Sequence, residues 1–436
     1  MENYFKQSWQ VIKQNKLLSS VYIIGTALAI AMVIAYTIVW YVKIAEIPPE
    51  VNRGRTLYMG YLAELSDNGC SSFDMSNKFI EKAIPKDMIG KEIECVVEYC
   101  KSDYGEINAY SSNLIDGIDV EVTYTTSNIC NVFDYKFLYG RPFTQNDVEA
   151  VAKKAFITES YAKKMFGKSD AVGEIIKLNS TNYNICGVIA DISKVTTLSY
   201  SNVWVPVTCD AEYGISTFGE TQMLSKFNTI ILARSKNDIP KIKMEINKKI
   251  KQINSSLKGI KLKNYGQPDT HFYSIFRAHS NSMPKIGENI RSILLTLLSL
   301  LLIPTVSLAG IIASGIDNRL EELGIRKAFG ASRSRLMIQI IVENLLLTFI
   351  GGVLGLFISY IIVWGTAGWL LQIVDFSYDF PIEMDRVLIT PIMLFNPIIF
   401  IITFIITLVL NLLAVIIPAA IVLHKNIIYS LTADKK

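Results

Sequence analysis

Residues 319–343 read RLEELGIRKAFGASRSRLMIQIIVE, a charged segment that two glycines interrupt and two long apolar runs flank. From Leu320 to Phe329 the apolar positions recur with helical spacing and give a helix with one partly apolar side. Ser332 follows, where its hydroxyl can cap the start of the next helix. The segment therefore predicts a short, cationic, bent element that joins two apolar helices.

The composition points to a membrane protein. Half of the 436 residues are hydrophobic, and the mean hydropathy is +0.32, which soluble chains of this length seldom reach. Apolar residues concentrate in four blocks, each long enough for a helix that rises about 1.5 Å per residue to cross about 30 Å of hydrocarbon. The predicted membrane helices span residues 17–42, 291–316, 338–371 and 396–423.

The first block could instead be a cleaved secretory signal. Its apolar run exceeds the usual signal-peptide core of about 7–15 residues, and no small-x-small cleavage site stands before Pro48 and Pro49. We interpret residues 17–42 as an uncleaved first helix.

Lysine and arginine gather before the first helix and between the second and third, whereas a single arginine lies between the third and fourth. The positive-inside rule therefore predicts that both termini are cytoplasmic. The predicted organisation is a cytoplasmic N-terminus at 1–16, an extracytoplasmic domain at 43–290, a cytoplasmic segment at 317–337, an extracytoplasmic loop at 372–395 and a cytoplasmic tail at 424–436.

The domain at 43–290 has a mixed pattern of strands and helices. Period-two alternation predicts strands at 55–65, 91–100, 119–133, 174–179, 183–191 and 201–208. Helices are expected at 75–84, 156–166 and 238–257, with Thr158 opening the second and Asp238 capping the third. The lysine-rich face of the third is explained by solvent, with a polyanion-binding face as the alternative. The predicted fold class is a membrane protein with four transmembrane α-helices and a large α+β extracytoplasmic domain inserted between helices one and two.

All six cysteines fall in this inserted domain: Cys70, Cys95, Cys100, Cys130, Cys186 and Cys209. An extracytoplasmic position permits disulfides, and Cys95 and Cys100 are close enough in sequence to pair across a turn. Cys186 lies in an alternating run where a buried free thiol would serve as a small apolar residue. The pairing stays open. The cysteine and histidine spacings match no metal-ligand pattern, so no metal site is predicted.

No catalytic residue is predicted either. The chain lacks HExxH and GxSxG, and its single GKS string, residues 167–169, has Ala162 where a phosphate-binding loop needs its first glycine. A net charge of +4 without a basic stripe gives no reason to expect nucleic acid as a partner.

The segment that follows the second helix resembles one protein family closely. Its residues fit R-x-x-E-x-G-I-R-x-A-x-G-A, and Glu343 stands where that family has a glutamate in its next membrane helix. Residues 131–147 and 159–191 also resemble the family's external domain. The matching positions are Arg319, Glu322, Gly324, Ile325, Arg326, Ala328, Gly330 and Ala331. The family is that of the permease subunits of MacB/FtsX-like ABC transporters, whose four helices and external domain transmit movement across the membrane.

The resemblance implies a role for the segment and a set of partners. It identifies residues 319–331, Lys327 included, as the coupling element for a cytoplasmic ABC ATPase that carries ATP and Mg²⁺; this chain itself is expected to bind no cofactor. The ATPase is expected on a separate chain, because about sixteen residues precede the first helix. A dimer with a second copy or a paralogue, in a bacterial inner membrane, is also implied. The alternative interpretation is that the cations of this segment only set the orientation of the chain in the membrane.

Small and polar residues inside the predicted helices have structural interpretations. Gly351, Gly352 and Gly355 give the third helix a face for close helix packing, and Pro304 is expected to kink the second. Asn411, near the middle of the fourth helix, is expected to hydrogen-bond to a neighbouring helix, with a substrate contact as the alternative.

The function expected is export or extraction of a substrate already outside the cytoplasm, such as a peptide, an antibiotic or a lipid-linked molecule. A periplasmic adaptor or an outer-membrane channel could then take part. One alternative is FtsX-like activation of a cell-wall hydrolase, and another is a membrane-anchored sensor without an ATPase. The substrate-binding residues are unknown from the sequence.

Overall fold

The computed structural model describes residues 9–10, 12–67, 69–102, 107–111, 114–194, 196–215, 218–277, 282–317, 320–374 and 396–424. The chain forms two compact units. The membrane unit comprises Met1–Tyr41, Gly287–Val374 and Ile389–Lys436, and the second unit comprises Val42–Ile286 and Asp375–Leu388. We call Val42–Ile286 the inserted domain.

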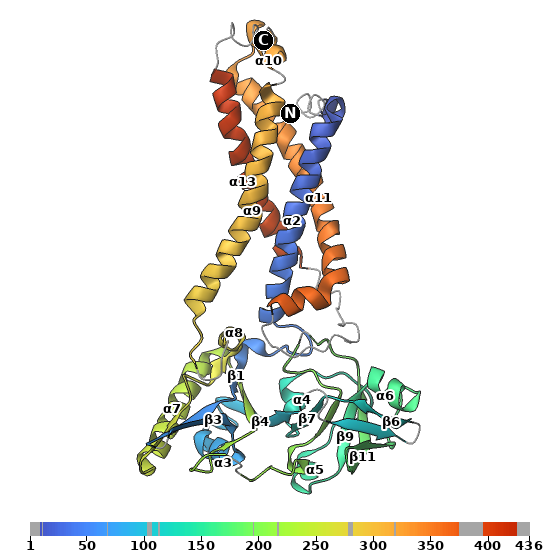
Figure 1. The fold of residues 1–436 in the computed structure, drawn as a ribbon, viewed down its shortest axis with the longest axis vertical. Coiled ribbons are helices and arrows are strands. Elements are labelled where there is room, and N and C mark those ends of the chain that lie inside the picture. The colour runs from blue at the N-terminus through green and yellow to red at the C-terminus, as the bar shows by residue number, and fades with distance from the viewer. Residues whose placement is uncertain are drawn as a thin grey trace. The chain divides into compact units, whose positions relative to one another are not determined.

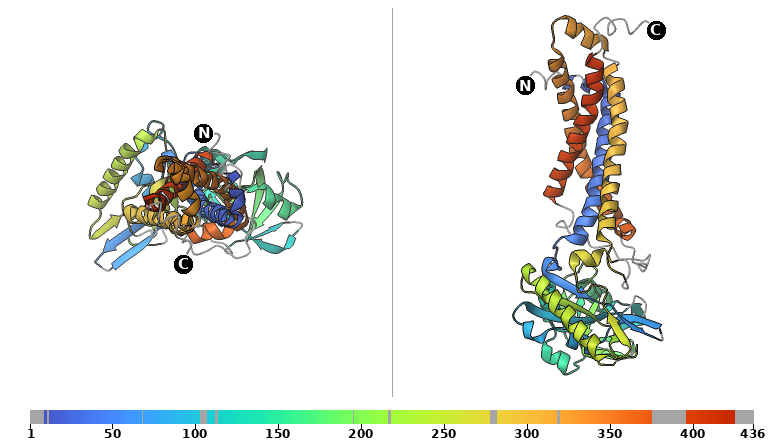
Figure 2. Two further views of the ribbon diagram at one scale, coloured as in Figure 1. Left: turned by 90° about the horizontal axis from the view of Figure 1, so that it is seen from above. Right: turned by 90° about the vertical axis from the view of Figure 1, so that its left-hand side faces the viewer.

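Four long helices build the membrane unit, and Figures 1 and 2 show them running alongside one another. They are α2 (Lys16–Ile44), α9 (Ile286–Asp317), α11 (Arg333–Val374) and α13 (Pro397–His424). Each contains a stretch long and apolar enough to cross a membrane, which confirms the predicted number of membrane helices. The short helix α10 (Leu320–Ala328) lies between α9 and α11 in the chain.

Glycines bring α11 close to its neighbours. A Cβ on Gly355 would lie 2.8 Å from the carbonyl oxygen of Ala27 in α2, and one on Gly351 would lie 2.9 Å from the Cβ of Thr26. A Cβ on Gly352 would lie 2.5 Å from the Phe404 ring of α13. These distances are below ordinary van der Waals contact, so the helices could not approach as closely with larger residues.

The inserted domain is built on two sheets. The larger has twelve strands in the order β16-β1-β14-β4-β7-β12-β9-β11-β10-β5-β6, with β8 paired to β11; the smaller has the order β13-β3-β2-β15. The strands are β1 (Thr56–Met59), β2 (Leu62–Ser66), β3 (Gly69–Met75), β4 (Ile93–Lys101), β5 (Asn108–Ser111), β6 (Leu114–Asp119), β7 (Val122–Thr125), β8 (Phe137–Gly140), β9 (Lys154–Thr158), β10 (Ile175–Leu178), β11 (Thr181–Ile189), β12 (Val203–Pro206), β13 (Leu224–Ser225), β14 (Asn228–Ala233), β15 (Ile260–Lys263) and β16 (Asp269–Thr270).

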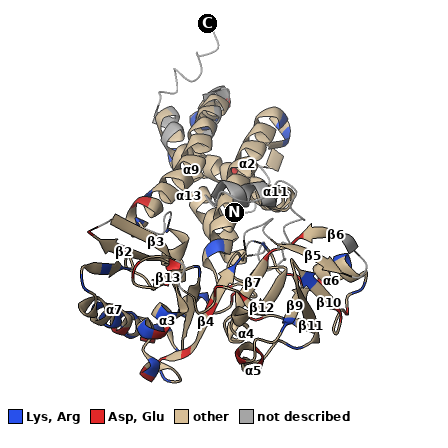
Figure 3. Cartoon of the chain, turned by 60° about the horizontal axis from the view of Figure 1, so that its bottom comes forward, with Lys and Arg blue, Asp and Glu red and all other residues tan. Residues whose placement is uncertain are grey.

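Helices cover parts of both sheets: α3 (Asn77–Ala83), α4 (Ile129–Val132), α5 (Gln145–Glu149), α6 (Glu159–Phe166), α7 (Ile239–Ser256) and α8 (His271–Ile275). Figure 3 shows α7 and α3 beside β2 and β3 at one side of the domain, and α6 beside β9 to β11 at the other, with β4 between. Each side has its own buried apolar cluster, one centred on β4, β14 and α7 and one on β9, β11 and α6. The mixed α+β architecture between the first two membrane helices confirms the predicted fold class.

Most elements of the domain fall where alternation or helical spacing predicted them. Helix α7 buries Ile242, Ile246 and Ile250, spaced four residues apart as expected for its apolar face. Among the lysines between them, Lys248 is exposed and Lys243 and Lys249 are half-buried. Figure 3 colours the basic residues along α7 blue. Asp238 occupies the N-cap position of α7 as predicted, but its carboxylate makes no capping hydrogen bond there. It instead accepts the Ser235 backbone N–H, in the capping box of the preceding 3₁₀ turn.

One strand prediction and one helix prediction need correction. The strand expected at 119–133 ends at Thr125, and Ile129–Val132 form α4, whose residues Ile129 and Val132 are buried. The helix expected at 156–166 begins at Glu159 because the residues before it belong to β9. Thr158 occupies the N-cap without a side-chain hydrogen bond, and Gly167 ends the helix with φ of +70°.

The suggested pair Cys95–Cys100 is wrong because both residues lie on β4, an odd number of positions apart, so their side chains leave opposite faces of the strand. All six cysteines are free thiols in the structure. Burial raises the pKa of Cys95, Cys100 and Cys130 to about 12, which suppresses the thiolate and its reactivity.

Candidate functional site: the coupling segment and the root of helix α2

The coupling segment, residues 319–331, ends in a defined turn. The N–H of Ala331 donates to the carbonyl of Arg326 at 3.0 Å, and the N–H of Gly330 donates to the carbonyl of Lys327 at 3.1 Å. Gly330 has φ of +89°, a conformation that costs a residue with a side chain free energy. This pair of bonds is the Schellman motif, which ends a helix and turns the chain sharply.

The next helix starts at once. The hydroxyl of Ser332 accepts the N–H of Arg335 at 3.4 Å, so Ser332 caps α11 as the sequence predicted. One helix therefore stops and another starts within a few residues, and both ends have hydrogen-bond partners. The bend between α10 and α11 is fixed by the backbone.

Arg326 lies at the centre of this bend. Its guanidinium donates to Oε1 of Gln339 in α11 at 2.7 Å and to Oε1 of Glu322, one turn back in α10, at 2.5 Å. Arg319, three residues before Glu322, lies outside the described residues. The ion pair Arg326–Glu322 is 35% and 47% exposed in its side chains. It is accessible to another molecule.

Two apolar side chains near the bend are exposed as well. Phe329 is 89% exposed and Ile325 is 49% exposed, although both belong to a segment whose other face is buried at Gly324. Large apolar side chains next to cations on a short helix are typical of a protein docking surface. Within the membrane unit, Glu322, Arg326, Gln339 and Glu343 also line a cavity of about 60 Å³ together with Tyr22 of α2.

A chain of polar contacts crosses the membrane unit. The hydroxyls of Tyr22 in α2 and Thr348 in α11 lie 3.0 Å apart, and the Asn411 amide in α13 donates to Thr348 at 3.4 Å. The Thr305 hydroxyl in α9 lies 3.5 Å from the other end of the same amide. Asn411 thus contacts two other helices, and the chain includes one side chain from each of the four long helices.

The inserted domain has a second arginine–glutamate pair, at the end of α2. Nε of Arg53 donates to Oε2 of Glu50 at 2.8 Å, and its Nη1 donates to the carbonyls of Val42 and Ala45, each at 2.6 Å. The other carboxylate oxygen of Glu50 accepts the backbone N–H of Ser199 at 3.0 Å. The two side chains are 3% and 1% exposed.

His271 completes this group. Its Nε2 lies 2.8 Å from the carbonyl oxygen of Lys43, and burial, followed by the nearby Arg53 charge, lowers the pKa of the imidazole. The ring is therefore neutral at pH 7 and donates from Nε2. We call Glu50, Arg53 and His271 the root cluster. Arg53 and His271 donate to the carbonyls of Val42, Lys43 and Ala45, at and just after the end of α2, which would otherwise have no partner in the helix, and Glu50 pairs with Arg53.

The positions expected to couple to an ATPase thus lie on one short helix and its C-terminal turn, except Arg319, which is outside the described residues. The helix-packing positions Gly351, Gly352, Gly355 and Asn411 all face other helices of the membrane unit. Sequence reasoning missed the root cluster. A charged pair three residues apart, directly after an apolar helix and a double proline, was the signal that could have indicated it.

Comparison with known proteins identifies the architecture. The family model of the MacB-like periplasmic core domain matches residues 19–249, and that of the FtsX-like permease C-terminal region matches residues 293–427. The chain belongs to the MacB/FtsX-like family of ABC transporter permeases. Members of this family are transmembrane subunits whose ATPase activity resides in a separate or fused domain.

Similar proteins include the uncharacterized ABC transporter permease YknZ of Bacillus subtilis, 25% identical over 256 residues, or 58% of this chain and 60% of YknZ. The macrolide export ATP-binding/permease protein MacB of Burkholderia cenocepacia is 27% identical over 229 residues, or 52% of this chain and 31% of MacB. The chain therefore matches less than two thirds of either relative. The crystal structure of the periplasmic region of MacB from Actinobacillus actinomycetemcomitans aligns at 14% identity with a TM-score of 0.32, covering 48% of this chain and 90% of that structure.

Proposed function

We propose that the chain is the permease half of an ABC complex, in which a cytoplasmic ATPase on a separate chain docks on residues 319–331. ATP binding and hydrolysis in that partner move the membrane helices, and the inserted domain pushes or releases a substrate that is already outside the cytoplasm. A pair of permease chains, identical or paralogous, would bind the ATPase dimer.

The observation that carries this proposal is the capped bend at the coupling segment. A docking surface that transmits force must not deform under load, and here the Schellman turn, the Ser332 cap and the Arg326 contacts fix the backbone. Phe329 and Ile325 supply the exposed apolar anchors that protein interfaces use. A loop that merely held topology would need the cations but neither the turn nor the anchors.

The root cluster supports the second half of the proposal. Helix α2 is continuous from Lys16 to Ile44, and the carbonyls of its last turn are bonded to Arg53 and His271. Displacement of this turn is therefore transmitted to β1 and α8, the elements next to those two residues. This would let the inserted domain act on cargo without a pore through the membrane.

The decisive experiment uses the chain reconstituted with its ATPase. Reversing Arg319 and Arg326 to Glu should abolish the ATPase stimulation that the permease provides, while membrane insertion stays intact. The matched control reverses Arg333 and Arg335 to Glu, which changes the charge by the same amount just beyond the coupling segment, in the first turn of α11 and outside the matched motif. If both double reversals act equally, the cations serve topology; if stimulation survives the first, the coupling assignment is wrong.

Orientation can be tested with the native thiols. Cys70 is the exposed cysteine of the inserted domain, so a thiol reagent that cannot cross the inner membrane should label the wild type and not Cys70→Ser. Ser334→Cys in the Cys70→Ser background should stay unlabelled in intact cells and react after lysis. Labelling at residue 334 in intact cells would contradict cytoplasmic placement of the coupling segment.

A further inference from the structure

The inserted domain contains a cavity of about 750 Å³ that the coupling mechanism does not use. Its volume is within the range of about 300–1,000 Å³ that small-molecule sites occupy. Strand β3, strands β4 and β7 and the segment around Lys226 supply its walls. The cavity lies wholly within the described part of Val42–Ile286, and its lining combines aromatic rings with charged groups.

Four aromatic residues line the cavity. Phe73 and Phe218 stack with ring centroids 3.9 Å apart and interplanar angle 8°, and both rings are partly exposed. Tyr99 and Tyr124 line the cavity from the adjacent strands β4 and β7. Aromatic faces bind apolar bodies and also attract cations through the ring quadrupole.

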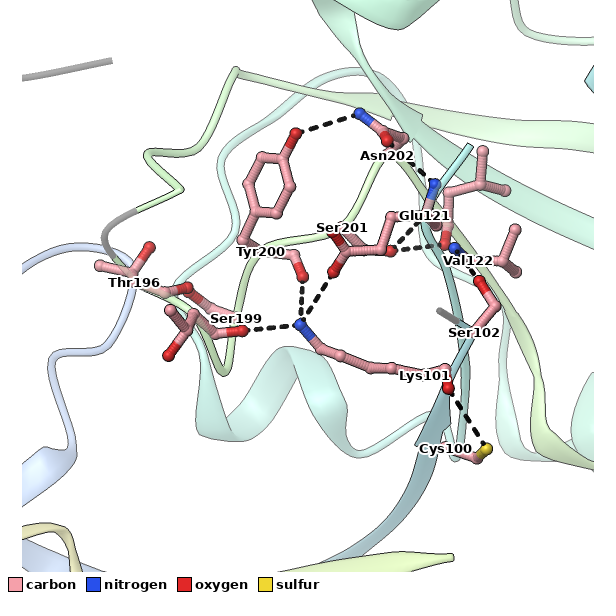
Figure 4. A network of polar contacts seen from close by, with 12 residues as sticks. Cys100, Lys101, Ser102, Glu121, Val122, Thr196, Ser199, Tyr200, Ser201 and Asn202 are labelled. Atoms are coloured by element: carbon pink, nitrogen blue, oxygen red, sulfur yellow. Dashed lines mark hydrogen bonds and ion pairs between the residues drawn. The ribbon is translucent and has the colours of Figure 1, made fainter. Parts of the chain in front are cut away.

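The two lysines of the lining already have partners. Nζ of Lys101 donates to the carbonyls of Thr197 and Tyr200, each at 2.6 Å, and lies 3.2 Å from Oε1 of Glu121 (Figure 4). An ammonium group has three protons, so these acceptors satisfy it. Lys226 lies 3.1 Å from the Asp210 carboxylate and 3.6 Å from that of Glu212. Lys226 thus forms ion pairs with two acidic residues of the lining, Asp210 and Glu212.

Asp74 is the carboxylate of the lining whose described contact is neutral. Its Oδ2 accepts the side-chain amide of Asn228 at 3.0 Å. Burial raises the pKa of Asp74 to about 6, and the Asn228 hydrogen bond opposes this shift. At pH 7.5 a largely buried negative charge therefore faces the cavity without a cation, which is an unfavourable state that a bound cation would relieve.

We propose that this cavity binds a molecule that carries a protonated amine on an apolar or aromatic body. The amine pairs with Asp74, and the body lies against Tyr99, Tyr124 and the Phe73–Phe218 stack. An anion of the same shape is rejected, because the acidic groups of the lining outnumber its lysines. The site is independent of the ATPase-coupling assignment.

The test uses tryptamine as the probe, with the full chain in lipid nanodiscs at pH 7.5 and calorimetry as the readout. Indole-3-ethanol is the neutral match and indole-3-acetate the anionic match. Tryptamine should bind at least about tenfold more tightly than either, because a charge-assisted hydrogen bond contributes about 1.5–3 kcal/mol. Equal binding of tryptamine and indole-3-ethanol, or no measurable binding of tryptamine, overturns the proposal.

Substitutions test whether tryptamine binds at Asp74 and at the Phe73–Phe218 stack. Asp74→Asn should reduce tryptamine affinity to that of indole-3-ethanol, Asp74→Glu should retain a preference for the cation, and Asp87→Asn, at an exposed aspartate of the same domain, should change nothing. Should Asp74→Asn fail to fold, Phe218→Ala in the Phe73–Phe218 stack serves instead, with an expected loss of severalfold in affinity. Unchanged tryptamine binding in folded Asp74→Asn, or in Phe218→Ala, would refute the site.

Discussion

The chain contains two arginine–glutamate pairs that are chemically alike and differ in burial. Glu50 and Arg53 in the root cluster are 1% and 3% exposed, whereas Glu322 and Arg326 in the coupling segment are 47% and 35% exposed. The first pair also bonds the Val42 and Ala45 carbonyls and a backbone N–H, so Nε and Nη1 of Arg53 and both carboxylate oxygens of Glu50 are used internally. The side chains of the second pair remain partly exposed to solvent. A buried pair holds structure, and an exposed pair is open to a partner.

Energy scales make this contrast quantitative. Removing one member of a buried pair leaves an uncompensated charge and costs about 3–5 kcal/mol, whereas an exposed pair contributes about 0–1 kcal/mol. The coupling segment therefore does not depend on its ion pair for its shape, which the backbone turn provides. The root cluster does depend on its ion pair.

The largest effect is expected from Arg53→Met. It leaves the Glu50 carboxylate buried with one backbone donor and removes the partner of the Val42 and Ala45 carbonyls, so stability should fall by about 3–5 kcal/mol. Thermal unfolding of the purified chain measures this, with Arg141→Met at an exposed arginine as control. Adding Glu50→Gln should recover part of the loss. Equal stability of the two single variants would show that the root cluster is not structural.

The next effect is expected from Glu98, a half-buried carboxylate that forms no salt bridge with the described residues. Burial raises the pKa of Glu98 to about 7, with a hydrogen bond from Tyr213 acting in the opposite direction. The folded chain then holds a proton that the unfolded chain has released between about pH 4.5 and 7, so this residue makes stability fall as pH rises, by up to about 3 kcal/mol. Glu98→Gln should flatten that slope.

The free energy of unfolding should be measured against pH for both proteins, and the wild-type value subtracted from that of Glu98→Gln. Asp74 and His271 titrate in both proteins, so their contributions cancel in this difference. Glu149→Gln, at an exposed glutamate, is the control. A wild-type slope that persists in Glu98→Gln would contradict the raised pKa.

Packing rather than charge should stabilise the membrane unit. Gly355→Ala places a Cβ 2.8 Å from the Ala27 carbonyl oxygen, and overpacking of this kind costs about 1–3 kcal/mol. Gly365→Ala, in the same helix with nothing within 4 Å, is the matched control and shares any gain in helix propensity. The difference in Tm between the two variants isolates the steric contribution, and a Gly355→Ala protein as stable as its control would argue against close α2–α11 packing.

The smallest effect on stability is expected from Glu322→Gln. Loss of an exposed pair one helical turn apart should change stability by less than about 1 kcal/mol, whereas Glu50→Gln, the same substitution in the root cluster, should cost several times more. Thermal unfolding of both variants sharpens the contrast directly. Equal losses would mean that burial does not separate the two pairs.

The sequence predicted those features that depend on local pattern. Apolar runs of membrane length predicted the number of membrane helices, four-residue spacing located Ile242, Ile246 and Ile250 on the buried face of α7, and Ser332 marked a helix start. The sequence pattern wrongly predicted a strand at Ile129–Val132, where the β-branched residues Ile129 and Val132 are the buried residues of a short helix. Alternation cannot distinguish a strand from one turn of helix whose apolar side is covered.

By itself the sequence determined the membrane class, the inserted α+β domain, the family and the position of the short helix α10 between two membrane helices, because hydropathy, period and motif are properties of neighbouring residues. The tertiary structure decided which arginine–glutamate pair is buried and which carboxylates remain without a cation. Those outcomes depend on contacts between distant segments: Glu50 meets Ser199, His271 meets Lys43, and Asp74 meets Asn228. Burial and its electrostatic cost arise only when such segments pack together.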